Sequence, residues 1–220
     1  MVWSLEKRAL TRMVSKLYPA RAPRHLDFAC GTGRILAHLA PLVADSTGVD
    51  ISASMLELAR CSAPAATLIE ADLTRQNPIA DERFDLITAF RFFPNAEPSL
   101  RSAVMRILAS QLCEGGHLIF NNHKNETSLV RRILKWRGRL IPEATLNRQE
   151  IDVLLGDAGL SRIDCVPLAC LPLTEQHMLQ PAKLVEALER GMSLIPGVES
   201  IAQNTIYLAT AATAATPLNP

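Results

Sequence analysis

A chain of 220 residues with a formal net charge of +1 fits one folded domain with a sizeable core. Hydrophobic residues make up 48% of it, which argues against a disordered chain, and the near-neutral charge gives no reason to expect a nucleic-acid partner. We expect a single domain over residues 1–210 and a frayed tail over 211–220, a stretch of small residues and prolines.

The cysteine pattern bears on metal binding and on the compartment. The five cysteines form no Cys-x-x-Cys pair and no Cys/His cluster with zinc spacing, so we expect no metal centre. An odd count, together with an N-terminus that lacks the apolar centre of a signal peptide, favours reduced thiols and a cytoplasmic location. No run of about 18 apolar residues occurs, so the sequence predicts no membrane-spanning helix.

Amphipathic stretches and short apolar runs alternate along the chain. The first amphipathic helix carries Leu10, Met13, Val14 and Leu17 on one face. The pattern then predicts strands at 25–29, 46–51, 67–71, 84–90, 116–121, 161–170 and 205–211. It predicts helices at 34–43, 52–60, 98–111 and 148–158, and a helical insert near 181–192. This alternation is typical of βαβ units, so we expect a doubly wound α/β fold with a mostly parallel seven-stranded sheet. Helical cap elements are expected at about 123–146 and 171–203.

A glycine-rich turn joins the first predicted strand to the next helix. Its sequence runs from Asp27 through Phe-Ala-Cys-Gly-Thr to Gly33. Glycine lets a ligand approach the backbone, and the start of a helix offers free N–H groups. GxG turns also occur for purely structural reasons in many α/β proteins, so the turn alone does not decide the function.

Two further acidic residues follow predicted strands. Asp50 ends the second strand, and its carboxylate could accept hydrogen bonds from the hydroxyls of a ribose. Asp72 follows the third strand, where an acceptor could hold an exocyclic amine such as that of adenine. Open α/β sheets bind their ligands at the carboxyl ends of strands, and Asp27 falls at such an end too. The three acids together therefore indicate a nucleotide-like cofactor.

These segments resemble the class I methyltransferases that use S-adenosylmethionine (SAM). LDFACGTGRIL is similar to the family's SAM-binding turn, GVDISASML to its ribose and adenine segment, and EADL to its adenine-amine contact. FDLITAF and LCEGGHLIF are similar to the fourth strand and to the turn and strand after it. The resemblance covers about 24–122 and implies a Rossmann-like methyltransferase fold with SAM as cofactor. One departure is Ala29, which stands where the family usually has its first glycine.

The resemblance also assigns roles to individual residues. It implies that Asp27, Gly31 and Gly33 line the methionine end of SAM and that Asp50 holds the ribose. Ile51 and Met55 would pack on the adenine face, and Asp72 would meet the adenine amine. The full set of cofactor residues expected is Asp27, Ala29, Cys30, Gly31, Gly33, Asp50, Ile51, Met55, Asp72, Leu73 and Phe90.

Two other functions remain open from the sequence. A nicotinamide-dependent oxidoreductase would need a third glycine at position 36, where this chain has Leu36. A SAM-binding subunit without catalytic activity would carry the same cofactor motifs. Titration with SAM and with NAD, followed by an assay for the product S-adenosylhomocysteine (SAH), would separate the three.

The methyl acceptor should lie beyond the carboxyl edge of the sheet, under the connections that leave it. His123 is the candidate general base there, since imidazole titrates near neutral pH. The same sequence position would also fit a solvated loop histidine without a catalytic role. Arg91 and Asn95 are candidate acceptor contacts, and Arg91 could equally form a surface ion pair. We expect a small-molecule acceptor, and a saccharide or a lipid-linked compound are the two classes considered.

A basic amphipathic segment follows the fifth predicted strand. Over 128–140, Leu129, Ile133, Trp136 and Leu140 fall on one helical face, and several arginines and a lysine lie elsewhere. Such a helix can lie on an anionic membrane surface, or it can pack on the core with its charges in water. Both readings stay open from the sequence.

Overall fold

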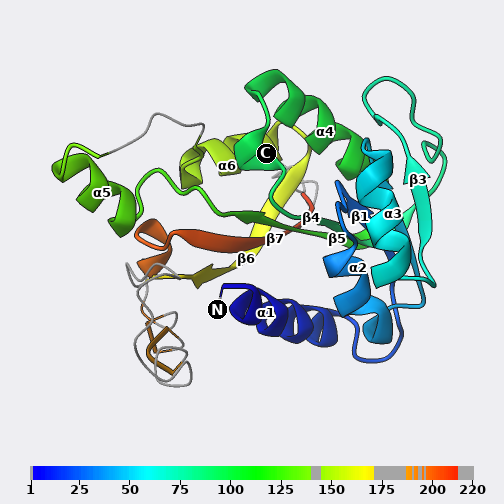
Figure 1. The fold of residues 1–220 in the computed structure, drawn as a ribbon, viewed down its shortest axis with the longest axis horizontal. Helices are drawn as coiled ribbons and strands as arrows, with labels where there is room; N and C mark the ends of the chain where they lie inside the picture. The colour runs from blue at the N-terminus through cyan, green and yellow to red at the C-terminus, as the bar shows by residue number, and fades with distance from the viewer. Residues whose placement is uncertain are drawn as a thin grey trace, which may run out of the picture.

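A seven-stranded sheet with helices on both faces forms the body of the protein in the computed structural model (Figure 1). The structure describes residues 2–139, 145–170, 187–189, 191–192, 195 and 197–212. The strand order is β3-β2-β1-β4-β5-β7-β6; β7 runs antiparallel to β5 and to β6, and the pairings from β3 through β5 are parallel. The predicted doubly wound, mostly parallel fold is confirmed.

The strands are β1 Arg24–Phe28, β2 Asp45–Asp50, β3 Thr67–Glu70, β4 Phe84–Ala89, β5 Leu112–Asn122, β6 Leu160–Leu168 and β7 Asn204–Ala211. The helices are α1 Val2–Leu17, α2 Arg34–Leu39, α3 Ala53–Ser62, α4 Pro98–Ser110, α5 Leu129–Trp136 and α6 Arg148–Gly156, with short 3-10 turns η1 Ala40–Leu42, η2 Phe93–Asn95 and η4 Val198–Ser200. Every strand that the sequence predicts therefore exists, with shifts at some ends.

Two of these shifts have clear physical causes. The helix expected to reach Val43 ends at Leu39 and tightens into η1, because Pro41 has no N–H to continue the helical ladder. The fifth strand begins at Leu112 rather than at Gly116. Gly115 takes φ +70° inside the strand, and the register with β4 shifts there, so the two glycines form an irregularity within β5 instead of a turn before it.

The two faces of the sheet bury separate sets of apolar side chains. On one face α1 and α2 pack their buried leucines against β4, β5 and β7, and α2 meets α3 through a small cluster that includes Leu36 and Leu56. On the other face α4 and α6 cover a larger core that contains Phe84, Phe93 and Phe120. Layers on both sides leave the carboxyl ends of β1, β2 and β4 as the open edge of the sheet, where a ligand can bind.

One buried carboxylate ties α1 to the far strands. Glu6 is fully buried, and its Oε1 accepts hydrogen bonds from the amides of Asn121 at 3.1 Å and Asn204 at 2.9 Å. Asn121 lies near the end of β5 and Asn204 begins β7, so α1 is held against the carboxyl end of β5. Its place there is set by polar contacts as well as by apolar packing.

Parts of the expected caps are described. The cap at 123–146 contains α5, which the structure assigns to Leu129–Trp136 with Ser128 as its N-cap; Leu140 lies outside the described residues. Of the helical insert near 181–192, residues 187–189 and 191–192 are helical, and the rest, like 213–220 of the tail, lies outside the described residues. Within the described chain, no helix combines the length and the apolar character needed to cross a bilayer.

Candidate cofactor and acceptor site

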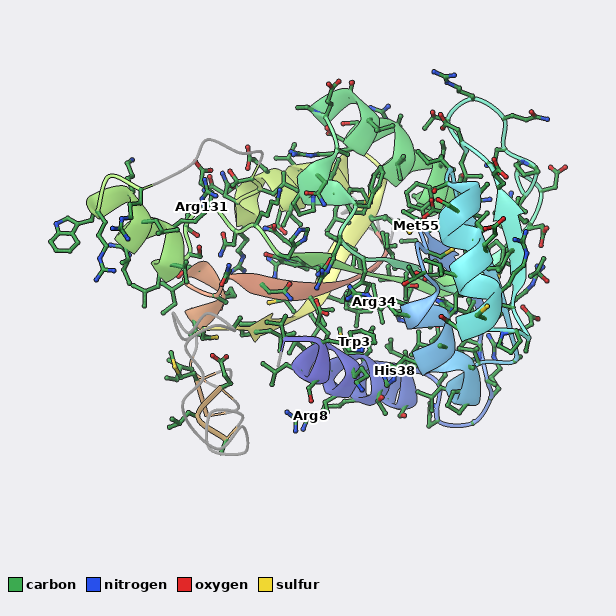
Figure 2. All side chains as sticks on the ribbon, in the orientation of Figure 1. Trp3, Arg8, Arg34, His38, Met55 and Arg131 are labelled. Carbon is green, nitrogen blue, oxygen red and sulfur yellow. The ribbon has the colours of Figure 1, made fainter. Side chains whose placement is uncertain are left out.

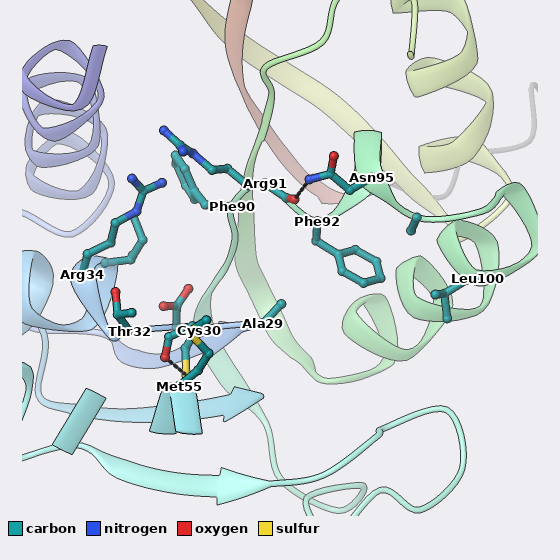
Figure 3. Close-up of a pocket in the computed structure, with 14 residues that line it drawn as sticks. Ala29, Cys30, Thr32, Arg34, Met55, Phe90, Arg91, Phe92, Asn95 and Leu100 are labelled. Carbon is teal, nitrogen blue, oxygen red and sulfur yellow. Dashed lines mark hydrogen bonds between the residues drawn. The ribbon is translucent and has the colours of Figure 1, made fainter. Parts of the chain in front are cut away.

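A cavity of about 610 Å³ opens at the carboxyl ends of β1 and β4 (Figure 3). It lies between the turn that follows β1, the first turn of α2 and the segment that follows β4. The lining residues are Asp27, Ala29, Cys30, Gly31, Thr32, Arg34, Ile35, Met55, Phe90, Arg91, Phe92, Asn95, Ala96 and Leu100. Small-molecule sites usually measure roughly 300–1,000 Å³, so the cavity has the size of a ligand site.

Two glycines shape the turn for different reasons. Gly31 takes φ +54°, and a Cβ placed on it would point into open space. Gly33 takes φ +74°, and a Cβ there would lie 3.0 Å from the Cβ of Ala59 and 3.1 Å from its Cα. Gly33 is therefore needed for α2 to pack against α3. Gly31 keeps the cavity side of the turn free of side-chain atoms, which lets a ligand approach the backbone.

Ala29 occupies the position before these glycines and is also left-handed. Its φ is +53°, a conformation that costs an L-residue about 1–2 kcal/mol. The family's usual glycine would adopt it without strain.

We expect Ala29→Gly to raise the free energy of unfolding by roughly 0.5–1 kcal/mol. The relief of strain exceeds the extra entropy that glycine gains in the unfolded chain. Chemical denaturation of both proteins, compared at equal m-values, measures the difference. A loss of stability of 1 kcal/mol or more would contradict a strained Ala29.

Asp27 carries a buried carboxyl group at the floor of the cavity. Its Oδ1 accepts a hydrogen bond of 2.6 Å from Thr88 Oγ1, whereas its buried Oδ2 accepts none from the residues that the structure describes. Burial raises the pKa of Asp27 to about 7, and the hydrogen bond from Thr88 opposes that rise. An unsatisfied acceptor in such a place suits a cationic donor on a ligand, because a positive charge would offset the cost of ionising the buried acid.

Asp50 connects the second strand to the turn. Its Oδ2 accepts the N–H of Gly31 at 2.7 Å, and its Oδ1 accepts the N–H of Ser52 at 3.0 Å. Each carboxylate oxygen keeps a further lone pair for another donor. Asp50 therefore fixes the turn and still has capacity for the hydroxyl groups of a ribose.

The predicted adenine contacts differ in how well they are placed. Met55 lines the cavity and is 42% exposed, and Ile51 is 72% exposed beside the end of β2. Met55 therefore offers an exposed apolar surface to a flat ring in the cavity, whereas Ile51 is not among the lining residues. Asp72 is not among the lining residues: its Oδ1 accepts from the N–H and hydroxyl of Thr74, and its Oδ2 pairs with Arg75. Leu73 is buried in the core instead.

The expected acceptor contacts are brought together only in part. Arg91 and Asn95 line the cavity together with Phe90, one of the expected cofactor residues, and Asn95 donates a hydrogen bond of 2.6 Å to the carbonyl of Arg91 (Figure 3). His123 is half-buried directly after β5 and is not among the lining residues. The structure therefore does not bring it to the cavity, and its role as a general base stays a prediction.

Three polar residues in or behind the site are not predicted from the sequence. Thr88 was hidden within an apolar strand pattern, although a single hydroxyl in FDLITAF was a usable signal. Arg34 opens α2, and its guanidinium lies 4.8 Å from the ring centroid of Trp3, which only the tertiary fold brings near (Figure 2). Glu6 shares the helical stripe of Leu10, Met13 and Leu17, and an acid on an apolar stripe indicates a buried partner.

The comparisons with known proteins agree on one family. Residues 26–116 match the model of the methyltransferase domain family. Among curated proteins, a ubiquinone biosynthesis O-methyltransferase from Acinetobacter baylyi is 24% identical over 187 residues, which cover 76% of this chain and 77% of that protein. The region matched by the family model contains the glycine turn, Asp50, strands β2 to β4 and the last three residues of β1.

Solved structures share the fold over nearly the whole chain. The SAH-bound magnesium protoporphyrin IX methyltransferase from Synechocystis is 19% identical, with a TM-score of 0.66 over 96% of this chain and 85% of that one. The SAM-bound amino pentose methyltransferase from Micromonospora echinaspora is 16% identical, with a TM-score of 0.63 over 96% and 92%. The architecture extends beyond the segment matched by the family model.

Proposed function

Since the chain belongs to the class I SAM-dependent methyltransferase family, we propose that it transfers a methyl group to a small-molecule acceptor bound in the cavity beside Phe92. SAM is the cofactor, and it supplies an electrophilic methyl group on a positively charged sulfur. The observation that carries the proposal is the cavity itself. One side of it has the side-chain-free Gly31 and the unsatisfied Asp27, and the other side has the apolar wall of Phe92 and Leu100.

The residues of the chain fit SAM at three points. The free Oδ2 of Asp27 would accept the methionine ammonium, the backbone at Gly31 would lie against the cofactor, and Asp50 would hold the ribose. Holding the acceptor in line with the methyl group can by itself supply much of the rate, because proximity replaces a bimolecular encounter. The chain's part in the reaction is then to orient two ligands and to exclude water between them.

Two measurements test the proposal directly. Titration should show binding of SAM and no binding of NAD, because Leu36 stands where the fingerprint of NAD-binding proteins requires a third glycine. Incubation with SAM labelled on its methyl group, together with separated small-molecule, protein and RNA fractions of a cell extract, should transfer label only to the small molecules. Label in protein or RNA would refute the acceptor class, and SAM binding without SAH formation in any fraction would favour the non-catalytic subunit.

The ionisation of Asp27 predicts a pH-dependent affinity. An acid whose pKa is raised to about 7 in the folded protein is mostly protonated at pH 6 and mostly ionised at pH 8. If the ammonium of SAH binds the ionised form, its apparent dissociation constant should fall about tenfold from pH 6 to pH 8, in proportion to the ionised fraction. The stability of the free protein should change oppositely. The free energy of unfolding decreases as pH rises from about 4 to about 7, because in that range Asp27 is ionised in the unfolded chain but still largely protonated in the folded protein.

Isothermal titration with SAH across this pH range measures the effect. Asp27→Asn, which cannot titrate, provides the control and should give a flat profile. 5′-Methylthioadenosine, which lacks the ammonium, should also bind the parent protein independently of pH. An equal slope for SAH in the parent and in Asp27→Asn would assign the titration to another group.

A lipid-linked acceptor is a second candidate, and α5 favours it. None of the eight residues of α5 is buried, and Trp136 is 84% exposed. Arg131, Arg132 and Lys135 line a groove of about 400 Å³ against Ser200 and Ile201. In Figure 2, Arg131 lies at the opposite end of the molecule from Met55 at the cofactor cavity. An exposed tryptophan among cations suits the interface of an anionic membrane.

We expect the parent protein to co-sediment with vesicles that contain phosphatidylserine at low salt, and to be released at high salt. Changing Arg131, Arg132 and Lys135 to Gln should remove this binding, since each basic residue near such a surface contributes about 1 kcal/mol. Changing the exposed Arg12, Arg60 and Arg106 to Gln removes the same charge elsewhere and should leave it intact. Absence of the parent protein from the vesicle pellet at low salt would end this candidate.

A further inference from the structure

Two guanidinium groups share the cavity. Arg34 reaches in from α2 and Arg91 from the segment after β4, and both extend past Phe90 toward the same side (Figure 3). Burial lowers the pKa of Arg34, and the positive charge of Arg91 lowers it further. The two charges therefore repel each other across a partly desolvated space, an arrangement that a bound anion would stabilise.

The two arginines differ in how their charge is balanced. The guanidinium of Arg34 stacks over Trp3 at 4.8 Å and lies 4.0 Å from the carboxylate of Glu6. It also lies near Asp27, whose charge opposes the fall in its pKa. Arg91 makes no ion pair with any acid that the structure describes. The unbalanced positive charge of the cavity therefore belongs to Arg91.

The backbone of Arg91 is held firmly in an unusual conformation. Its φ is +61°, which is costly for a residue with a side chain. Its N–H donates to Asn121 Oδ1 at 2.7 Å, and its carbonyl accepts from Asn95. Asn121 is itself fixed by the buried Glu6. A chain of polar contacts from α1 through β5 thus directs this side chain from the end of β4.

One wall of the cavity is apolar. Phe92, Ala96 and Leu100 form its wall on the side away from Asp27. A ligand there would place an apolar or aromatic body against these side chains. In Figure 3 the guanidinium of Arg91 lies beside Phe90 and toward Arg34, and Phe92 and Leu100 lie on the other side of its backbone. A carboxylate or phosphate carried on such a body could bind this guanidinium through two parallel hydrogen bonds.

We propose that Arg91 is the specificity-determining residue for the acceptor, and that the acceptor is a small apolar or aromatic compound that carries an anionic group. This inference rests on the proposed function, because it assigns Asp27 and Gly31 to SAM. The acids Glu6 and Asp27 already balance the charge of Arg34, and Arg91 is the guanidinium of the cavity that remains for an anion on the acceptor. The anion fixes one end of the acceptor, and its nucleophilic atom is thereby oriented toward the methyl group.

The test uses the full-length protein saturated with SAH and three matched pairs of probes: benzoate with benzamide, cinnamate with cinnamamide, and indole-3-acetate with indole-3-acetamide. Ligand-observed NMR gives the dissociation constants. We expect the parent protein to prefer the acids by about tenfold, the difference expected for a hydrogen bond to a charged group. Arg91→Gln should lose this preference and Arg91→Lys should keep part of it. Arg60→Gln, an exposed change on α3, should leave it unchanged.

Several results would overturn the inference. The first is that the parent protein prefers the acids over the matched amides no more strongly than Arg91→Gln does. Absence of binding of every probe to both proteins counts as the same result. Another is an Arg91→Gln protein that binds SAH at least tenfold more weakly but binds 5′-methylthioadenosine normally, since Arg91 would then hold the carboxylate of the cofactor. Failure of the parent protein to bind SAH at all would instead refute the proposed function, so the two failures are distinguishable.

Discussion

Gly31→Val should weaken SAM binding by roughly a hundredfold, equal to about 2.7 kcal/mol, in a protein that still folds. The added side chain would point into the open space beside the turn, where the cofactor would lie, and among the described residues beyond its chain neighbours no atom lies within 4 Å of the new Cβ. Folding suffers less, because the cost is the strain of φ +54°, about 1–2 kcal/mol and somewhat more for a β-branched residue. Isothermal titration with SAM and thermal unfolding measure the two effects separately.

Gly33→Ala is the matched control, with the opposite expected outcome. Its new methyl group would meet the backbone and side chain of Ala59 at about 3 Å, so α2 and α3 would have to separate. Overpacking and left-handed strain together should cost roughly 2–4 kcal/mol of stability. The folded fraction should still bind SAM. A Gly31→Val protein that binds SAM as tightly as the parent would show that the turn has only a structural role.

Asp50→Ala should weaken SAM binding by about 10- to 150-fold, or roughly 1.5–3 kcal/mol, the range for hydrogen bonds to a charged group. The carboxylate also accepts the N–H groups of Gly31 and Ser52, so the variant should lose some stability as well. Asp50→Asn keeps one acceptor oxygen and should lose less affinity than Asp50→Ala.

Titration of the variants with SAM and with adenosine checks the assignment. Adenosine contains the ribose and no methionine, so its binding should fall in the same proportion as that of SAM. Glu57→Ala removes an exposed acid from the neighbouring α3 and serves as the charge control. An unchanged affinity for SAM in folded Asp50→Ala would place the ribose elsewhere.

The predictions from the sequence succeed where the determining interactions are local. The strand, the glycine turn and the helix after it follow one another within a dozen residues, and each requires its own residue types. Asp50 follows from the same rule, because an acid at the end of a parallel strand lies at the ligand edge of the sheet. The central strands were found for a similar reason, since β4 and β7 are mostly apolar and largely buried along their length, whereas the edge strands β3 and β6 are partly exposed.

The contacts and conformations that the sequence does not predict are of two kinds, contacts between distant segments and details within single turns. Thr88 bonds to Asp27 from 61 positions away, and no local pattern relates the two. Asp72 follows a strand as predicted, and the Thr two positions later bonds to its carboxylate within the turn, so its contact with a ligand stays a prediction. Ala29 stands where the family usually has a glycine, and only its φ of +53° reveals the cost of the replacement. Whether His123 reaches a ligand depended on the path of the chain after β5, which the sequence does not specify.

The buried carboxylate of Glu6 also constrains the order of events during synthesis. Its partners Asn121 and Asn204 are 115 and 198 positions further along the chain. The first helix leaves the ribosome long before either amide exists, so its acid cannot be desolvated at low cost until the seventh strand has emerged. Strand β7 also inserts between β5 and β6, which are made before it. Completion of the sheet must therefore wait until β7 has been translated, and until then the nascent chain exposes sheet edges and apolar helix faces that a chaperone could recognise.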